Sequence, residues 1–99
     1  MAVHQVNVTI QNGMITVDQP VVRIHEDSFV QWNGNEPFSI EFDKPNAFGA
    51  RLSHAEAQRP NGPKQGNSGS YKYTIVSDKD NRIKLDPIVI VDPGTTGAH

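Results

Sequence analysis

The sequence predicts an all-β protein, a sandwich or barrel of about seven to eight strands with one short helix in the middle. Five runs in the first 42 residues alternate apolar with polar residues, which is typical of strands that bury one face. Each run ends in residues that favour turns, such as Asn, Gly, Asp and Pro. Further extended runs follow near the C-terminus. Many short strands separated by turns indicate a sandwich or a barrel.

The N-terminal runs cover residues 6–10, 14–17, 21–25, 29–32 and 38–42. Asn12 and Gly13 separate the first two runs and predict a tight hairpin, because both residues tolerate positive φ. Pro20 stands just before the third run rather than inside it, which fits a strand that begins there. Successive apolar residues in each run lie two apart and therefore share one face.

The middle of the chain, residues 45–68, lacks this alternation. Ser53 and Glu56 have the spacing of a capping box, in which each side chain bonds to the other residue's backbone N–H. The spacing predicts a short helix over residues 53–58, which ends before Pro60 because the residue before proline avoids the helical region. Residues 61–69 have the composition of a mobile loop.

The C-terminal third predicts the last strands. Tyr71, Tyr73 and Ile75 alternate with polar residues, residues 77–81 form a turn, and residues 83–85 make a short extended piece. Residues 88–91 are four apolar residues in a row, which indicates a strand buried on both faces or central in its sheet. Residues 95–99 are expected to be a frayed tail.

Composition limits the possible functions. A chain of 99 residues predicts one domain, residues 1–99. The absence of cysteine excludes disulfides, thiolate nucleophiles, zinc–cysteine sites and iron–sulfur clusters. A formal net charge of −2 gives no overall attraction to nucleic acid or to an anionic membrane, and no apolar run is long enough to span a bilayer. No secretory signal peptide is predicted, so the compartment stays open between the cytoplasm and, if a leader was removed, an extracytoplasmic site.

Charge is unevenly distributed along the chain. The segment from Lys44 to Lys72 has five basic residues and one acid, a net charge of +4, whereas the remainder has a net charge of −6. Ordinary solvated surface explains most such asymmetries. The alternative is a docking surface for an acidic partner.

Three stretches, taken in their order and spacing, resemble the cupredoxins, the Greek-key β-sandwiches that bind blue copper. They are residues 15–22, residues 26–33 and residues 69–73. The second is similar to the family's Gly-Asp-x-Val-x-Trp-x-Asn strand, although Glu26 replaces the glycine. The third is similar to the Gly-x-Tyr-x-Tyr/Phe strand that leads into the copper loop. The resemblance covers residues 6–91 and implies a cupredoxin-like Greek-key sandwich.

The residues at the family's ligand positions differ. The position that matches the first histidine is Phe38, the position of the cysteine is Ile75, the second histidine would lie near Asp78, and the axial methionine has no counterpart after Val76. A blue-copper centre requires the thiolate, because the Cu–S bond sets its geometry and electronics. The resemblance therefore implies a copper-free scaffold, whose function has to be argued from its own residues.

Our principal hypothesis is a non-enzymatic interaction module that has no cofactor and binds an unknown protein or small ligand, for which an acidic partner is one option. The residues predicted to face this partner are Arg51, His54, Arg59 and Lys64, which lie in the long basic segment. No catalytic constellation is recognised: residues 66–70 differ from a nucleophile elbow because the last position is serine and no helix follows.

Two alternatives stay open. One is a metal-handling protein in which His4 and His25 face each other across neighbouring strands and bind zinc or copper(II), although such sites usually need three or four ligands. The other is a structural subunit that self-associates through its oppositely charged regions. A calcium site at residues 78–89 is rejected because Arg82 and Val89 occupy ligand positions. Aromatic residues are more consistent with a core than with a ligand platform.

Overall fold

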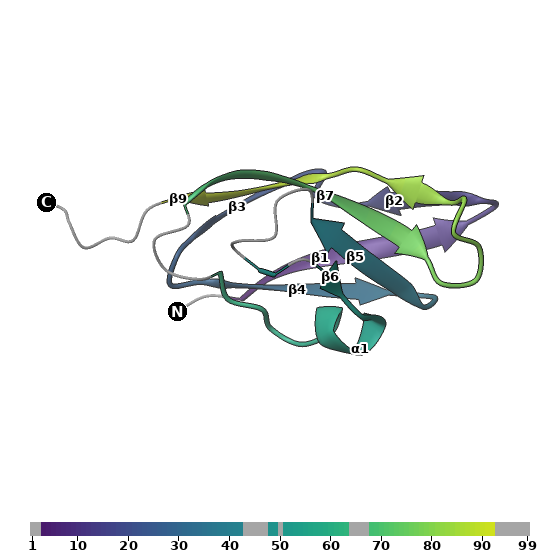
Figure 1. The fold of residues 1–99 in the computed structure, drawn as a ribbon, viewed down its shortest axis with the longest axis horizontal. Coiled ribbons are helices and arrows are strands. Elements are labelled where there is room, and N and C mark those ends of the chain that lie inside the picture. The colour runs from purple at the N-terminus through teal and green to yellow at the C-terminus, as the bar shows by residue number, and fades with distance from the viewer. Residues whose placement is uncertain (1–2, 43–47, 50, 64–67, 93–99) are drawn as a thin grey trace, which may run out of the picture.

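The computed structural model describes residues 3–42, 48–49, 51–63 and 68–92, and it shows a β-sandwich with one short helix (Figure 1). The elements within these residues are β1 (Val3–Gln11), β2 (Met14–Val17), β3 (Val21–His25), β4 (Phe29–Gly34), β5 (Phe38–Phe42), β6 (Arg51–Leu52), α1 (His54–Ala57), β7 (Gly69–Ser77), β8 (Lys84–Leu85) and β9 (Ile88–Asp92). The predicted all-β sandwich is confirmed.

The strands form two sheets. The three-stranded sheet has the order β2-β1-β4, and the six-stranded sheet has the order β3-β9-β7-β5-β6, with β8 paired to β7 beside that path. β1 pairs with β4, and β3 with β9, in parallel, while the other strand pairs are antiparallel. In Figure 1, α1 lies beside β6 and β4, at one side of the sandwich.

The core lies between the sheets, and the period-two pattern of the strands produces it. Alternate residues of β1, β3, β4, β5 and β7 are buried because successive side chains of a strand point to opposite faces. The largest fully buried side chains are Trp32, Tyr73 and Phe38. The expectation that the aromatic residues belong to the core is confirmed for Trp32, Phe38, Phe42, Tyr71 and Tyr73, which are all buried. Phe29 is half-buried.

Consecutive strands β2 and β3 lie in different sheets. Residues 18–20 carry the chain from the edge of the three-stranded sheet to the edge of the six-stranded sheet. The carbonyl of Pro20 accepts a hydrogen bond of 2.9 Å from the backbone N–H of Ile88, and this bond begins the pairing of β3 with β9. β2 and β3 are therefore the edge strands of their sheets, and residues 18–20 connect them.

The predicted helix is confirmed, with its capping box. The Ser53 hydroxyl accepts a hydrogen bond of 3.2 Å from the Glu56 backbone N–H, and the Glu56 carboxylate accepts one of 2.9 Å from the Ser53 N–H. These reciprocal bonds satisfy two donors at the helix start that have no intrahelical partner. Ala57 is buried and fixes the helix against the sandwich.

Two expectations need correction. The described residues contain nine strands rather than seven or eight, because the two-residue strand β6 lies in the segment that lacked alternation. Residues 61–63 are not a mobile loop: the N–H and C=O of Asn61 bond to Val30 at 2.8 and 2.9 Å, and Pro63 is buried. β9 is central, as predicted, but Ile88 and Ile90 are only half-buried. The predicted tail and residues 64–67 lie outside the described residues.

Candidate functional site

Two of the positions that the resemblance matches to copper ligands carry apolar side chains in the core. Phe38 and Ile75 are both fully buried, on the neighbouring strands β5 and β7. Asp78 follows β7 and is exposed, and its carboxylate accepts a hydrogen bond of 2.7 Å from the hydroxyl of Ser39. This end of the sandwich is therefore filled by hydrocarbon where the resemblance would place ligands.

His54 lies against Phe38 at the same end. The backbone N–H of Phe38 donates a hydrogen bond of 3.3 Å to Nδ1 of His54, and the two rings meet edge to face with centroids 5.0 Å apart. This bond requires the unprotonated Nδ1 as its acceptor. His54 is half-buried rather than fully on the surface, so part of its bonding capacity serves the fold.

The basic residues predicted to face a partner are not equally available. Arg51 donates to the hydroxyl of Ser39 at 3.2 Å and lies 4.0 Å from the carboxylate of Glu41. Arg59 is exposed. The pKa of Glu56 is lowered mainly by the hydrogen bonds from Ser53, and the positive charge of Arg59 lowers it further by a smaller amount. Lys64 lies outside the described residues. The surface formed by Arg51 and Arg59 therefore contains both signs of charge.

The two histidines of the metal alternative are not on neighbouring strands. His4 lies on β1, whose neighbours are β2 and β4, and His25 lies on β3, whose neighbour is β9. The expectation that they face each other across adjacent strands is wrong, because their strands belong to different sheets. Across the described ranges, no group of three or more His, Cys, Asp or Glu side chains is arranged to hold a metal ion.

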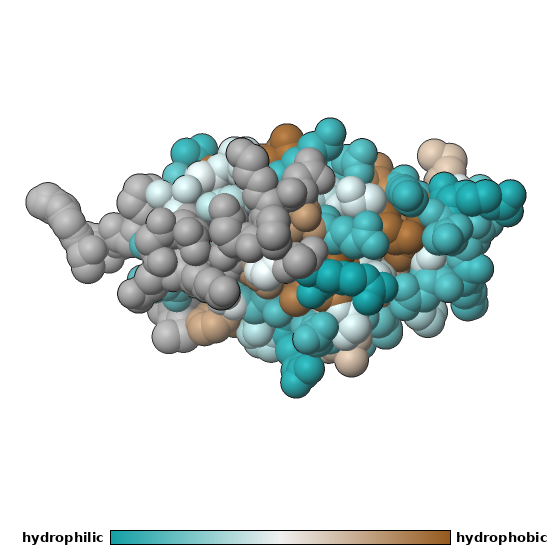
Figure 2. All heavy atoms as spheres, in the orientation of Figure 1, coloured by the Kyte–Doolittle hydropathy of each residue, from teal (hydrophilic) through white to brown (hydrophobic). Residues whose placement is uncertain are grey.

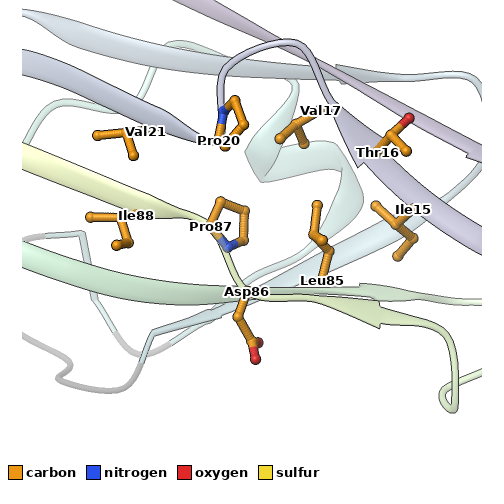
Figure 3. A pocket seen from close by; sticks show the side chains of 9 residues that line it. All are labelled: Ile15, Thr16, Val17, Pro20, Val21, Leu85, Asp86, Pro87 and Ile88. Atoms are coloured by element: carbon orange, nitrogen blue, oxygen red, sulfur yellow. The ribbon is translucent and has the colours of Figure 1, made fainter.

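A pocket of about 390 Å³ opens between β2 and the segment that joins β8 to β9 (Figure 3). Its volume lies within the range of natural ligand pockets. The residues that line it come from four strands and two connections: Ile15, Thr16, Val17, Pro20, Val21, Leu85, Asp86, Pro87 and Ile88. Figure 2 shows hydrophobic surface among hydrophilic residues near the end of the molecule where Figure 1 labels β2.

The interior of this pocket is hydrocarbon. Figure 3 shows that the hydroxyl of Thr16 and the carboxylate of Asp86 point away from the space enclosed by the aliphatic side chains. The carboxylate of Asp86 instead accepts a hydrogen bond of 2.7 Å from the hydroxyl of Thr74. Val21, at the pocket, is 53% exposed, an unusual exposure for a valine in a strand. The pocket therefore suits an apolar group and offers no inward polar side chain to orient it.

Sequence reasoning missed the pocket because its walls are far apart in the chain. Residues 15–21 and residues 85–88 meet only when the sandwich forms. The available signal was Pro20 and Pro87, each of which stands directly before a strand. Proline has no backbone N–H to donate to a neighbouring strand. The carbonyl of Pro20 accepts a hydrogen bond from Ile88, and the carbonyl of Pro87 accepts one from Tyr73. Prolines at these places mark where the paired strands begin.

In the described part of the chain, no helix is long and apolar enough to cross a membrane. No protein-family model matches the chain, and no curated protein matches it. Similar solved structures include the oxidized form of a methionine-to-leucine mutant of amicyanin, with 16% identity and a TM-score of 0.49. Another is the reduced Cu(I) form, at pH 4, of a proline-to-glycine mutant of amicyanin, with 14% identity and a TM-score of 0.47.

Each of these comparisons covers 88% of this chain and 81% of the amicyanin chain. The strand order and the two sheets described above make this chain a two-sheet β-sandwich, and its likeness to the cupredoxins stays a prediction from the sequence. It has no cysteine, and its residues at the family's ligand positions differ from the copper ligands.

Proposed function

We propose that this protein is a non-enzymatic binding module that receives an uncharged apolar group in the pocket between β2 and the β8–β9 connection. The observation that supports the proposal is the pocket itself, about 390 Å³ lined by aliphatic side chains and prolines. Water in such a pocket has few hydrogen-bonding partners, so an apolar group that displaces it removes apolar surface from water.

The magnitude of the gain is modest. Burying one aliphatic side chain or small ring contributes on the order of 2 kcal/mol, which gives weak binding unless other contacts add to it. The pocket therefore serves as the apolar part of a larger contact or as a weak site for a small neutral molecule. Both predict that a small apolar probe binds there with low affinity.

Titration with cyclohexanol, followed by the methyl resonances of ¹³C-labelled protein, tests the proposal. We expect saturable shifts at the methyl groups of Ile15, Val17 and Leu85, and an unchanged resonance for Ile40, which is fully buried and does not line the pocket. Shifts that are absent, or that spread evenly over all methyl groups, would contradict the proposal.

The chain offers a matched pair of variants. Val21→Asp places a carboxylate at the pocket, whereas Val3→Asp makes the same change on an exposed valine of β1, which does not line the pocket. Both valines are about half exposed, so both variants should fold. We expect Val21→Asp to weaken cyclohexanol binding at least tenfold and Val3→Asp to leave it unchanged.

The basic surface stays a separate prediction. Neutral substitutions at Arg51, His54, Arg59 and Lys64 should weaken binding of an acidic partner, because favourable long-range attraction is lost. Poly-glutamate is a suitable probe, and its binding should weaken as salt is added. Binding that is equal in the wild type and the neutral variant would count against this surface.

A further inference from the structure

The edge of β2 next to the pocket has free backbone groups. β2 pairs with β1, and the hydrogen bond of 3.2 Å from Asp18 N–H to the carbonyl of Asn7 fixes which residues face β1. Since the direction of backbone groups alternates along an antiparallel strand, Ile15 and Val17 direct their N–H and C=O groups away from β1. Within the described residues, no other strand pairs with this side of β2.

The same two residues combine both properties of the site. Their side chains line the pocket, and their backbone groups stand at its rim. A strand placed beside β2 would lie opposite them, and its inward side chains would enter the pocket between Ile15, Val17 and Leu85. An extended segment therefore satisfies the backbone of β2 and fills the apolar space in one arrangement.

A small molecule satisfies only half of these requirements. The pocket has no inward polar side chain to orient a ligand, as Figure 3 shows for Thr16 and Asp86. The directional groups at this place belong to the backbone of the strand edge, and extended peptides are the ligands that such edges recognise.

Charge indicates the ends of the segment. Asp18 follows β2 and is exposed, and its carboxylate accepts bonds of 2.8 Å from the backbone N–H and the side-chain amide of Asn7 on β1. The backbone hydrogen bond from Asn7 lowers the pKa of Asp18, so this carboxylate is negative at neutral pH. The carboxylate of Asp86 points away from the pocket and bonds to Thr74, so it does not take part in this contact. A basic residue at the end of the segment complements Asp18.

We propose that the occupant of this site is an extended segment of a partner protein, which pairs antiparallel with β2, places alternate apolar side chains in the pocket and carries a Lys or Arg near Asp18. This inference rests on the proposed function, because the same pocket receives the apolar side chains. The added strand would widen the three-stranded sheet to four strands over the broader opposite sheet.

The test uses the peptide acetyl-Lys-Val-Thr-Val-Thr-Val-Lys-amide and two N-methylated versions of it. In antiparallel pairing the valines, whose side chains point into the pocket, direct their backbone N–H and C=O groups to β2. The threonine N–H groups point away from β2. We expect methylation of the valine nitrogens to weaken binding at least tenfold and methylation of the threonine nitrogens to change it less than threefold. The reverse pattern, or an equal effect of both, would overturn antiparallel pairing.

Amide hydrogen exchange locates the bound peptide. With saturating peptide, the amides of Ile15 and Val17 should exchange at least tenfold more slowly, while the amide of Thr16, which already faces β1, should change little. Binding without protection of these two amides would overturn the inference. Val17→Pro should abolish peptide binding, and its thermal unfolding reports whether the variant still folds.

Other occupants give distinct results. If cyclohexanol binds in the pocket but the peptide does not, strand pairing is overturned and the proposed function stands; if neither binds, both fail. If the free protein sediments as a dimer that Val17→Pro or Val21→Asp dissociates, a second copy occupies the edge and the inference of a separate partner is overturned. A monomer at all protein concentrations is the expected result.

Discussion

The indole N–H of Trp32 donates a hydrogen bond of 3.1 Å to the phenolic oxygen of Tyr73, and both side chains are fully buried. The rings meet edge to face with centroids 5.6 Å apart, a favourable arrangement for aromatic pairs. Trp32 lies on β4 and Tyr73 on β7, so this bond joins the two sheets through the core. A polar contact in this place fixes how the sheets lie on each other.

Removing the acceptor of this bond should destabilise the fold. Tyr73→Phe leaves the buried indole N–H without a partner, which costs about 1–3 kcal/mol. Urea unfolding followed by tryptophan fluorescence measures the change. Tyr71→Phe is the control, because its hydroxyl makes a longer contact of 3.5 Å with the Ser68 carbonyl. Equal losses for the two variants would contradict a special role for the Trp32 bond.

Stability should fall at alkaline pH because of Tyr73. Burial raises the pKa of its phenol from 10 to about 12. Below pH 10 both the folded and the unfolded states keep the proton; above pH 10 the unfolded state loses it first, so the free energy of unfolding decreases as the pH rises through the folded pKa. The difference is on the order of 2–3 kcal/mol.

Unfolding measured between pH 9 and pH 12 checks this dependence. This range roughly spans the pKa values of the unfolded and folded states. Over it, the free energy of unfolding of Tyr73→Phe should decrease less than that of the wild type. Parallel decreases in the two proteins would assign the effect to other groups.

Two glycines next to phenylalanine rings should differ in their tolerance of alanine. A Cβ at Gly34 would lie 2.5 Å from the ring of Phe38, which is fully buried, whereas a Cβ at Gly62 would lie 2.9 Å from the ring of Phe29, which is half-buried. Overpacking costs about 1–3 kcal/mol where the neighbour cannot move. We expect Gly34→Ala to be the more destabilising variant in thermal unfolding; the opposite order would contradict this account.

The capping box of α1 should have a measurable effect on both stability and titration. Ser53→Ala removes one of the two reciprocal bonds and should cost about 1 kcal/mol. The backbone hydrogen bond from Ser53 is the largest of the effects that lower the pKa of Glu56. Because a lowered pKa stabilises the folded state above that pKa, this contribution is lost as the pH falls through it.

NMR titration of the Glu56 carboxylate distinguishes the two bonds of the box. In Ser53→Ala the backbone N–H of residue 53 remains, so the pKa of Glu56 should rise only part of the way towards 4.5. Ala55→Ser, an exposed change within α1, is the control and should leave the titration unchanged. A fully normal pKa in Ser53→Ala would show that the box had opened.

The local signals of the sequence were sufficient for eight of the nine strands in the described residues. Val22 and Ile24 are buried with exposed neighbours because alternation alone sets the face of a strand, and the Ser53–Glu56 spacing formed its capping box. β6 was missed because a two-residue strand has no period to detect. Its place depends on pairing with β5, which is a tertiary contact.

The candidate sites were less predictable, because they depend on packing between distant segments. The pocket forms only where residues 15–21 meet residues 85–88. His54 was expected on the surface of a helix, and only the position of β5 reveals that it accepts a bond from Phe38. Arg51 likewise meets Glu41 through the pairing of β6 with β5.

The pairing of β3 with β9 has a consequence for synthesis of the chain. Val21 lies opposite Ile88, and β3 has no other neighbour in its sheet within the described residues. Contacts this distant in sequence form slowly, because a long loop must close before they can be made. On the ribosome, β3 therefore stays unpaired from the time it leaves the exit tunnel until β9 has also left it, so a chaperone could bind the apolar residues Val22 and Ile24 during this interval.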